Sequence, residues 1–246
     1  MPDPEDPRKF FSAHHHAYVT SPRHARGQDL SVLIAGLEPQ AGQRALDVAT
    51  GGGHTALRLA ESGMEVTATD ITPEMLQDAL ALASERGLRL IAVEAPAEAL
   101  PFPANHFHRV STRRAAHHFR DVPRFLEEAR RVLVPGGRLG ISDMTGSAAG
   151  IDWLNQLERL RDPSHYQAWD PDAWYRALVA AGFVNIVLRL SEEMMTFLEW
   201  LTPVEPGDPN GRAALHFLSH PDAPYEFVRG QTFVKQRILI WAEKPE

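Results

Sequence analysis

Short apolar runs alternate with helical patterns of apolar and polar residues over much of the first half of the chain. Such alternation is typical of repeated βα units, in which helices cover a mainly parallel sheet. The strands of this segment are expected at residues 45–49, 65–69, 89–93, 108–112 and 138–143. The pattern therefore predicts an α/β fold with a doubly wound sheet and helices on both faces.

Two helices between these strands have clear start and stop signals. Thr72 is placed to cap a helix whose first residue is Pro73 and which stops at Gly87. Asp121 is placed to cap a second helix, which is expected to break at Pro135-Gly136-Gly137. Each helix thus connects two strands that follow one another in the chain.

After the fifth strand the pattern changes. Residues 151–160 and a segment that begins at Asp170-Pro171 read as helices, and residues 203–211 are rich in proline and glycine. A sixth strand is expected at 183–190 and a seventh at 232–242, the latter as an antiparallel return. The complete sheet is thus predicted to have seven strands, mainly parallel, with an antiparallel last strand.

Composition narrows the class of protein. The 246 residues are 43% hydrophobic and 23% charged, as in ordinary globular proteins, and no apolar run is long enough to span a bilayer. The net charge of -7 disfavours binding to a nucleic-acid backbone. The absence of cysteine excludes disulfides, thiolate metal sites and a cysteine nucleophile. The first residues are acidic and proline-rich, unlike a secretory signal, so a cytoplasmic location is expected.

A glycine loop follows the first expected strand. The segment Leu46-Asp47-Val48-Ala49-Thr50-Gly51-Gly52-Gly53 leads from an apolar strand into glycines that let a ligand approach the backbone closely. Asp70 ends the second strand, where a carboxylate is able to accept both hydroxyls of a ribose. Together these features predict a site for an adenosine-containing cofactor.

The charge of Asp47 separates two candidate cofactors. The spacing Gly51-x-Gly53-x-x-Ala56 also fits a dinucleotide-binding loop. A carboxylate beside this loop would repel the pyrophosphate of NAD, whereas it would attract the sulfonium and ammonium groups of S-adenosylmethionine. The residues therefore favour S-adenosylmethionine over NAD.

Five segments, in order along the chain, resemble the class I methyltransferases, in particular the group that contains the ubiquinone and menaquinone C-methyltransferases. They are residues 46–53, Asp70, Ala97-Glu98-Ala99-Leu100-Pro101-Phe102, Ala115-Ala116-His117-His118-Phe119 and Leu133-Val134-Pro135-Gly136-Gly137. The resemblance implies a Rossmann-like fold with an antiparallel last strand, in agreement with the pattern above. It also implies S-adenosyl-L-methionine as cofactor and S-adenosyl-L-homocysteine as its product.

The resemblance assigns roles to individual residues and predicts one domain over residues 1–246. The residues expected to contact the cofactor are Asp47, Ala49, Gly51 and Gly53 at the methionine end, Asp70 and Ile71 at the ribose and adenine, Ala97 and Glu98 at the adenine edge, Arg113 facing the donor, and also Thr50 and Met75. The expected parts are an N-terminal helical cap at 1–44, a cofactor-binding core at 45–144, and lid or substrate-side insertions at 145–170 and 191–230.

Two positions depart from the family pattern. Ala49 stands where the first loop residue is usually glycine, a change also found in the quinone-methylating branch. Pro96 stands where many relatives have an aspartate that bonds the adenine amino group, so this contact must come from the backbone or from Glu98, or be missing.

Histidines and a tyrosine are the candidate general bases. His117, His165 and Tyr18, in that order, are expected to take a proton if the acceptor is a hydroxyl or an activated ring carbon. Two histidine runs are candidate metal ligands: His14-His15-His16 and His117-His118. Adjacent residues of one element point in different directions and no thiolate is present, so no metal site is expected.

The expected activity is transfer of a methyl group from S-adenosylmethionine to a small molecule by in-line displacement. The enzyme would contribute mainly orientation and exclusion of water. The expected partner is this small-molecule acceptor, without nucleic acid, and the chain is expected to be a monomer or a homodimer. The alternatives are an NAD-dependent oxidoreductase and a non-catalytic protein that binds S-adenosylmethionine without turnover.

Overall fold

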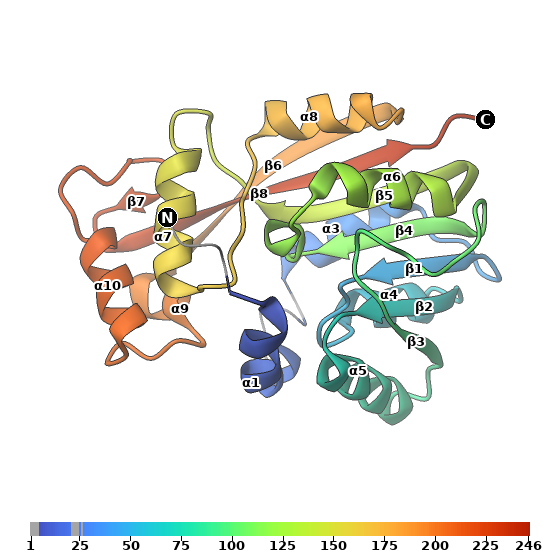
Figure 1. The fold of residues 1–246 in the computed structure, drawn as a ribbon, viewed down its shortest axis with the longest axis horizontal. Helices are drawn as coiled ribbons and strands as arrows, with labels where there is room; N and C mark the ends of the chain where they lie inside the picture. The colour runs from blue at the N-terminus through green and yellow to red at the C-terminus, as the bar shows by residue number, and fades with distance from the viewer. Residues whose placement is uncertain (1–4, 21–24, 26) are drawn as a thin grey trace.

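A single mixed sheet organises the chain in the computed structural model, which describes residues 5–20, 25 and 27–246. The strand order is β3-β2-β1-β4-β5-β8-β6, with the short β7 paired to β8 (Figure 1). The strands are Arg44–Val48 (β1), Glu65–Asp70 (β2), Leu90–Glu94 (β3), Phe107–Arg113 (β4), Leu133–Met144 (β5), Val184–Thr196 (β6), Val228–Arg229 (β7) and Thr232–Glu243 (β8). Neighbours from β3 to β5 are parallel, whereas β8 is antiparallel to both β5 and β6. The predicted α/β sheet with an antiparallel last strand is confirmed, with the two-residue β7 in addition.

Three of the helices begin directly after the predicted capping residues Thr72, Asp121 and Asp170. The helices are Pro7–Thr20 (α1), Gln28–Leu37 (α3), His54–Glu61 (α4), Pro73–Glu85 (α5), Val122–Val132 (α6), Ile151–Arg161 (α7), Pro171–Ala180 (α8), Phe197–Leu201 (α9) and Pro209–Leu218 (α10), with a 3-10 turn at Ala116–His118 (η1). The side chains of Asp121 and Asp170 accept the backbone N–H groups of Arg124 and Ala173. Thr72 precedes α5 as expected, but its side chain makes no cap hydrogen bond. None of the helices in the described ranges combines the length and the apolar character that crossing a bilayer requires.

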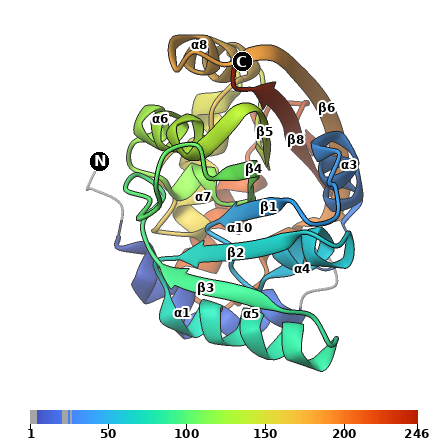
Figure 2. The same ribbon diagram turned by 90° about the vertical axis from the view of Figure 1, so that its right-hand side faces the viewer.

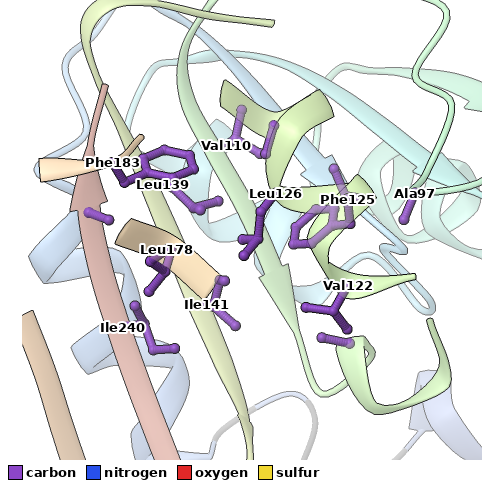
Figure 3. Packing of buried hydrophobic residues seen from close by; sticks show 14 of the residues in the cluster. Ala97, Val110, Val122, Phe125, Leu126, Leu139, Ile141, Leu178, Phe183 and Ile240 are labelled. Carbon is purple, nitrogen blue, oxygen red and sulfur yellow. The ribbon is translucent and has the colours of Figure 1, made fainter. Parts of the chain in front are cut away.

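Different helices cover the two faces of the sheet. Neighbouring residues of a strand point to opposite faces, and accordingly Leu46 packs in the cluster with α6 and α8 whereas Ala45 packs in the cluster with α3 and α4. Figure 3 shows Phe125 and Leu126 of α6 above Ile141 of the sheet. Figure 2 shows α3 and α4 on the other side of the strands. Both faces of the central strands are therefore covered by helices, as in a doubly wound sheet, whereas the edge strands β3 and β6 stay largely exposed or half-buried.

A second, smaller core lies where β5, β6 and β8 extend beyond the parallel strands (Figure 1, left). Leu154 and Leu157 of α7 are buried there with side chains of α9 and α10. The ring of Trp153 stacks on Phe217 and on Phe227. The apolar face of α7 is thus taken up by packing within the protein, and it needs no ligand to cover it.

The element boundaries differ from the prediction at two strands. β6 continues to Thr196 because its residues after Leu190 stay paired with β8 up to Thr232. β5 starts at Leu133, which pairs with Phe107 before a shift in register, so the Pro-Gly-Gly segment lies inside the strand. The helices α9 and α10 were not predicted within 191–230.

Candidate functional site

The glycine loop follows β1 with three residues in the left-handed region. Ala49 and Gly51 have φ of 52° and Gly53 has φ of 81°. A Cβ atom at Gly53 would lie 2.7 Å from the Cβ of Ala79 in α5, so the loop and this helix approach too closely for a side chain. Ala49 takes up this conformation at a cost of about 1–2 kcal/mol, which a glycine would avoid.

Asp70 joins the end of β2 to this loop. Its Oδ2 accepts the backbone N–H of Gly51 at 2.9 Å, and its Oδ1 accepts the backbone N–H of Thr72 at 2.9 Å. Burial raises the pKa of the Asp70 carboxyl, although these two backbone donors lower it in part. The carboxylate is therefore fixed in direction at the carboxyl end of the sheet, where open α/β sheets bind ligands.

A cavity of about 730 Å³ lies at this edge of the sheet. Most of the residues expected at the cofactor line it: Ala49, Thr50, Gly51, Asp70, Ile71, Met75, Ala97, Glu98 and Arg113. Of the expected site residues whose side chains the structure describes, Asp47, Gly53, His117 and His165 are absent from the lining. The volume falls within the usual range for small-molecule sites, about 300–1,000 Å³.

Asp47 lies beneath the loop and does not line the cavity. Its carboxylate accepts the hydroxyls of Ser111 at 2.6 Å and Thr50 at 2.7 Å. Burial raises the pKa of Asp47 to about 6, against the lowering effect of these hydrogen bonds. Asp47 holds the loop from below through Thr50, which does line the cavity, and its expected contact with the methionine end stays a prediction.

The segment after β3 forms the wall at which the adenine is expected. Pro96, Ala97 and Glu98 line the cavity, together with Glu94 at the end of β3. Oε1 of Glu98 accepts the backbone N–H of Arg120 at 3.0 Å. Glu98 thus ties this wall to the segment after η1, and its carboxylate is already engaged in part.

The histidines are arranged differently from the prediction. His117 is buried, its Nδ1 lies 2.5 Å from Oδ1 of Asp143, and it does not line the cavity. His165 is also buried, with Nε2 at 2.7 Å from Oδ1 of Asn155. Of the neighbouring pair it is His118 that lines the cavity. Tyr18 lies in α1, but its side chain is outside the described part of the chain.

The ring of His118 is oriented by the loop that precedes α8. Nδ1 lies 3.0 Å from the carbonyl oxygen of Ser164, which only accepts, so Nδ1 carries the hydrogen and Nε2 keeps its lone pair. Burial, followed by the neighbouring His117, lowers the pKa of His118 to about 4. His118 is therefore neutral near pH 7, with a free lone pair on Nε2, although the lowered pKa makes that nitrogen a weak base.

Arg113 is held by a buried carboxylate. Its Nε lies 2.7 Å from Oδ2 of Asp29, and Nη2 of Arg114 lies 2.7 Å from Oδ1 of the same residue. Burial would raise the pKa of Asp29, but the hydrogen bond of Arg113 and the charges of the nearby arginines hold it well below its usual range. The pair links α3 to the end of β4, so Arg113 has a structural role as well as its place in the cavity lining.

Helix α1, part of the helical cap expected at 1–44, supplies a wall of the cavity through residues that were not among those predicted. Pro7, Arg8 and Phe11 line the cavity, and the ring of Phe11 lies edge-on to His118 at 4.9 Å between centroids. The helix has no motif to mark this position. His118 could have been considered beside His117, since both belong to the same segment, but the choice depends on the turn at η1.

Comparisons with known proteins agree with this geometry. Residues 46–141 match the family described as "Methyltransferase domain". The uncharacterized methyltransferase YcgJ of Bacillus subtilis is 36% identical over 167 residues, which span 67% of this chain and 66% of YcgJ. The demethylmenaquinone methyltransferase of Thermus thermophilus is 45% identical over 102 residues, which span 41% of this chain and 46% of that enzyme.

A solved structure matches over a greater length. The protein BH2331 from Bacillus halodurans C-125, provisionally named a methyltransferase, is 32% identical, with a TM-score of 0.82 over 89% of this chain and 100% of that one. Because both the sequence and the fold are shared over the whole of that protein, the chain belongs to the class I S-adenosylmethionine-dependent methyltransferases.

Proposed function

We propose that this enzyme transfers the methyl group of S-adenosylmethionine to a small molecule within the described cavity. The observation that carries the proposal is the convergence of the glycine loop, Asp70 and His118 on one cavity. The ribose hydroxyls would be accepted by Asp70, and the methionine end would lie along Ala49, Thr50 and Gly51. The adenine would lie between Ile71 and the wall of Ala97, with Glu98 at its edge.

The cavity supports this proposal through its chemistry. S-adenosylmethionine supplies an electrophilic methyl group on a positively charged sulfur. A carboxylate that is fixed by two backbone donors suits a pair of ribose hydroxyls, since it accepts without having to reorganise. The buried Asp47 adds negative charge behind the loop, on the side where the cationic methionine end would lie. These residues thus fit a phosphate-free nucleoside better than a pyrophosphate.

His118 is the residue that we propose to take a proton from the acceptor. In the transfer, a lone pair of the acceptor forms the new bond to the methyl carbon while the carbon–sulfur bond breaks and sulfur keeps the electron pair. If the acceptor carries a proton, Nε2 of His118 would receive it, because the hydrogen on Nδ1 is directed to Ser164. We propose no proton transfer for His117 or His165, which are buried beside the cavity and do not line it.

A small-molecule acceptor is favoured by the enclosure of the site. The cavity is bounded by α1 on one side and by the carboxyl ends of the strands on the other, and the net charge of -7 is unsuited to a nucleic acid. The two segments 145–170 and 191–230 are proposed to act as the substrate-side part of the domain.

The direct test is formation of S-adenosylhomocysteine when the protein is incubated with S-adenosylmethionine and fractionated small metabolites. We expect the product to appear only with a fraction that contains the acceptor, and to be strongly reduced in His118→Gln. Binding of S-adenosylmethionine without product in any fraction would favour the non-catalytic alternative.

A further inference from the structure

Two histidines of α1 and one aspartate of α5 form a cluster outside the cavity lining. Nδ1 of His15 lies 2.6 Å from Oδ2 of Asp78, and the rings of His15 and His16 are 4.2 Å apart with planes inclined by 31°. One ring nitrogen of each histidine and one oxygen of Asp78 lie within 4.8 Å of one another. Among residues 5–20, 25 and 27–246, no other group of histidine, cysteine and acidic side chains is so closely spaced.

The sequence predicts no metal site at this histidine run, because neighbouring side chains of a helix point in different directions, but the structure brings the two rings together. Adjacent residues of a helix start about 100° apart around its axis, so two neighbouring histidines alone do not face one ion. The observed rings nevertheless come together over the surface of α5, where Asp78 supplies a third ligand. This aspartate is 63 positions away in the chain, which no local motif could reveal.

We propose that His15, His16 and Asp78 bind one Zn²⁺ ion. Imidazole nitrogens and carboxylate oxygens are ligands that zinc prefers, at about 2.0–2.2 Å, and three protein ligands with a water molecule make a common zinc site. Each side chain has a free path to solvent: His16 is exposed, His15 is 24% exposed and Asp78 is 19% exposed. The ion would replace the proton between His15 and Asp78, which lie at hydrogen-bond distance.

The position of this site gives it a consequence for the cavity. Phe11 and Arg8 on the same helix α1 line the cavity, and Met75 on α5 lines it from another side. An ion bound between the two helices would hold the α1 wall of the cavity against the α5 wall. Entry and release of the cofactor would then be slower with zinc bound. This consequence rests on the proposed function, whereas the zinc site itself does not.

The site is tested by titrating the metal-free full-length protein with Zn²⁺ in a calorimeter. Loss of even an outer partner of a metal site weakens binding about 10- to 100-fold, so His16→Ala and Asp78→Asn should each weaken zinc binding by about tenfold or more. His16 is exposed, so we expect its replacement to leave the fold intact, which urea unfolding of the variant checks. His14→Ala is the matched control, because Nδ1 of His14 bonds to the carbonyl oxygen of Phe10 within its own helix.

Two results would overturn the site. One is equal affinity in the wild type, His16→Ala and Asp78→Asn. The other is an equal loss in His14→Ala, which would assign the ion to the histidine run alone.

Whether zinc holds α1 against α5 is tested separately by the rate of tryptic cleavage after the exposed residues Arg8 and Lys9. Zinc should slow this cleavage in the wild type and have no effect in Asp78→Asn. Equal cleavage rates in the wild type with and without saturating zinc would contradict the claim that the ion holds α1 against α5. Neither measurement uses S-adenosylmethionine, so failure of the zinc proposal is distinct from failure of the proposed function.

Discussion

The backbone N–H of Gly51 donates to the carboxylate of Asp70 over 2.9 Å. The glycine loop and the acid at the end of β2, which are 19 positions apart, are therefore parts of one rigid unit. This unit explains why the loop glycines and the carboxylate face the same cavity. It also means that Asp70 has two roles: it supports the loop and it offers its oxygens to a ligand.

Replacing Asp70 should weaken binding of the cofactor product. A hydrogen bond to a charged group contributes about 1.5–3 kcal/mol, so Asp70→Asn should raise the Kd for S-adenosylhomocysteine by about 10- to 150-fold. Isothermal titration calorimetry measures this directly. Asp172→Asn is the control, because Asp172 is exposed on α8, away from the cavity. Equal affinity in both variants would contradict the proposed ribose contact.

Gly53→Ala should destabilise the protein more than Gly87→Ala. Both glycines have positive φ, 81° and 66°, so each alanine would cost about 1–2 kcal/mol of backbone strain. Only at Gly53 would the new Cβ meet another atom, at 2.7 Å from Ala79. Such overpacking typically costs a further 1–3 kcal/mol or so. Urea unfolding measures the difference, and equal stability of the two variants would show that α5 does not restrict the loop.

Periodicity and capping residues were sufficient to predict the scaffold. Asp121 and Asp170 cap the helices that follow them, and the parallel strands lie close to their predicted positions. The T-x-x-E pattern at Thr196 and Glu199 forms a capping box at α9 and is likewise a local signal of a helix start. These features are local, so the sequence contains the information that determines them.

The site was predictable only where its residues lie next to a strand end. The loop and Asp70 do, but the choice of His118 over His117 depends on the turn between them, and Phe11 reaches the cavity from a helix without a motif. Asp29 binds Arg113 from 84 positions away. Such partners are set by tertiary packing, which a single sequence does not display.

His118→Gln should reduce turnover without weakening binding of S-adenosylhomocysteine. Removal of a general base typically costs about 10²- to 10⁴-fold in rate, and the glutamine keeps the approximate size of the side chain. Because the pKa of His118 is lowered to about 4, titration of His118 should not change turnover between pH 8 and pH 5, and a fall that begins near pH 6 belongs to Asp47, whose pKa is raised to about 6. Initial rates of product formation measure both effects. His220→Gln, at an exposed histidine, is the control, and unchanged rates in His118→Gln would remove the proposed proton transfer.

The buried histidines should make the protein less stable in mild acid. Unfolded histidines take up protons near pH 6.5, whereas burial lowers the pKa of folded His118 to about 4 and that of His165 well below its usual value. Below pH 6.5 the unfolded chain thus binds more protons, and each group removes about 1.4 kcal/mol of stability per pH unit. Asp47 offsets the effect of one histidine. Its pKa is raised to about 6 in the folded protein, so below pH 6 the folded state takes up a proton there and gains stability relative to the unfolded chain.

The expected net change between pH 6 and pH 5 is therefore a loss on the order of 1 kcal/mol in the free energy of unfolding, which the raised pKa of the buried Asp70 reduces. His165→Gln removes one of the two histidines and should make the stability nearly independent of pH in this interval. Urea unfolding at both pH values checks the slope. A wild type that becomes more stable at pH 5 would show that the histidines are not held neutral.

The central claim is that the cavity beside Asp70 and the glycine loop accepts a phosphate-free, cationic nucleoside. Calorimetric titration of the wild-type chain with S-adenosylmethionine, and separately with NADH, tests it most directly. We expect one S-adenosylmethionine to bind per chain and no heat of binding with NADH. Binding of NADH together with no binding of S-adenosylmethionine would contradict the claim.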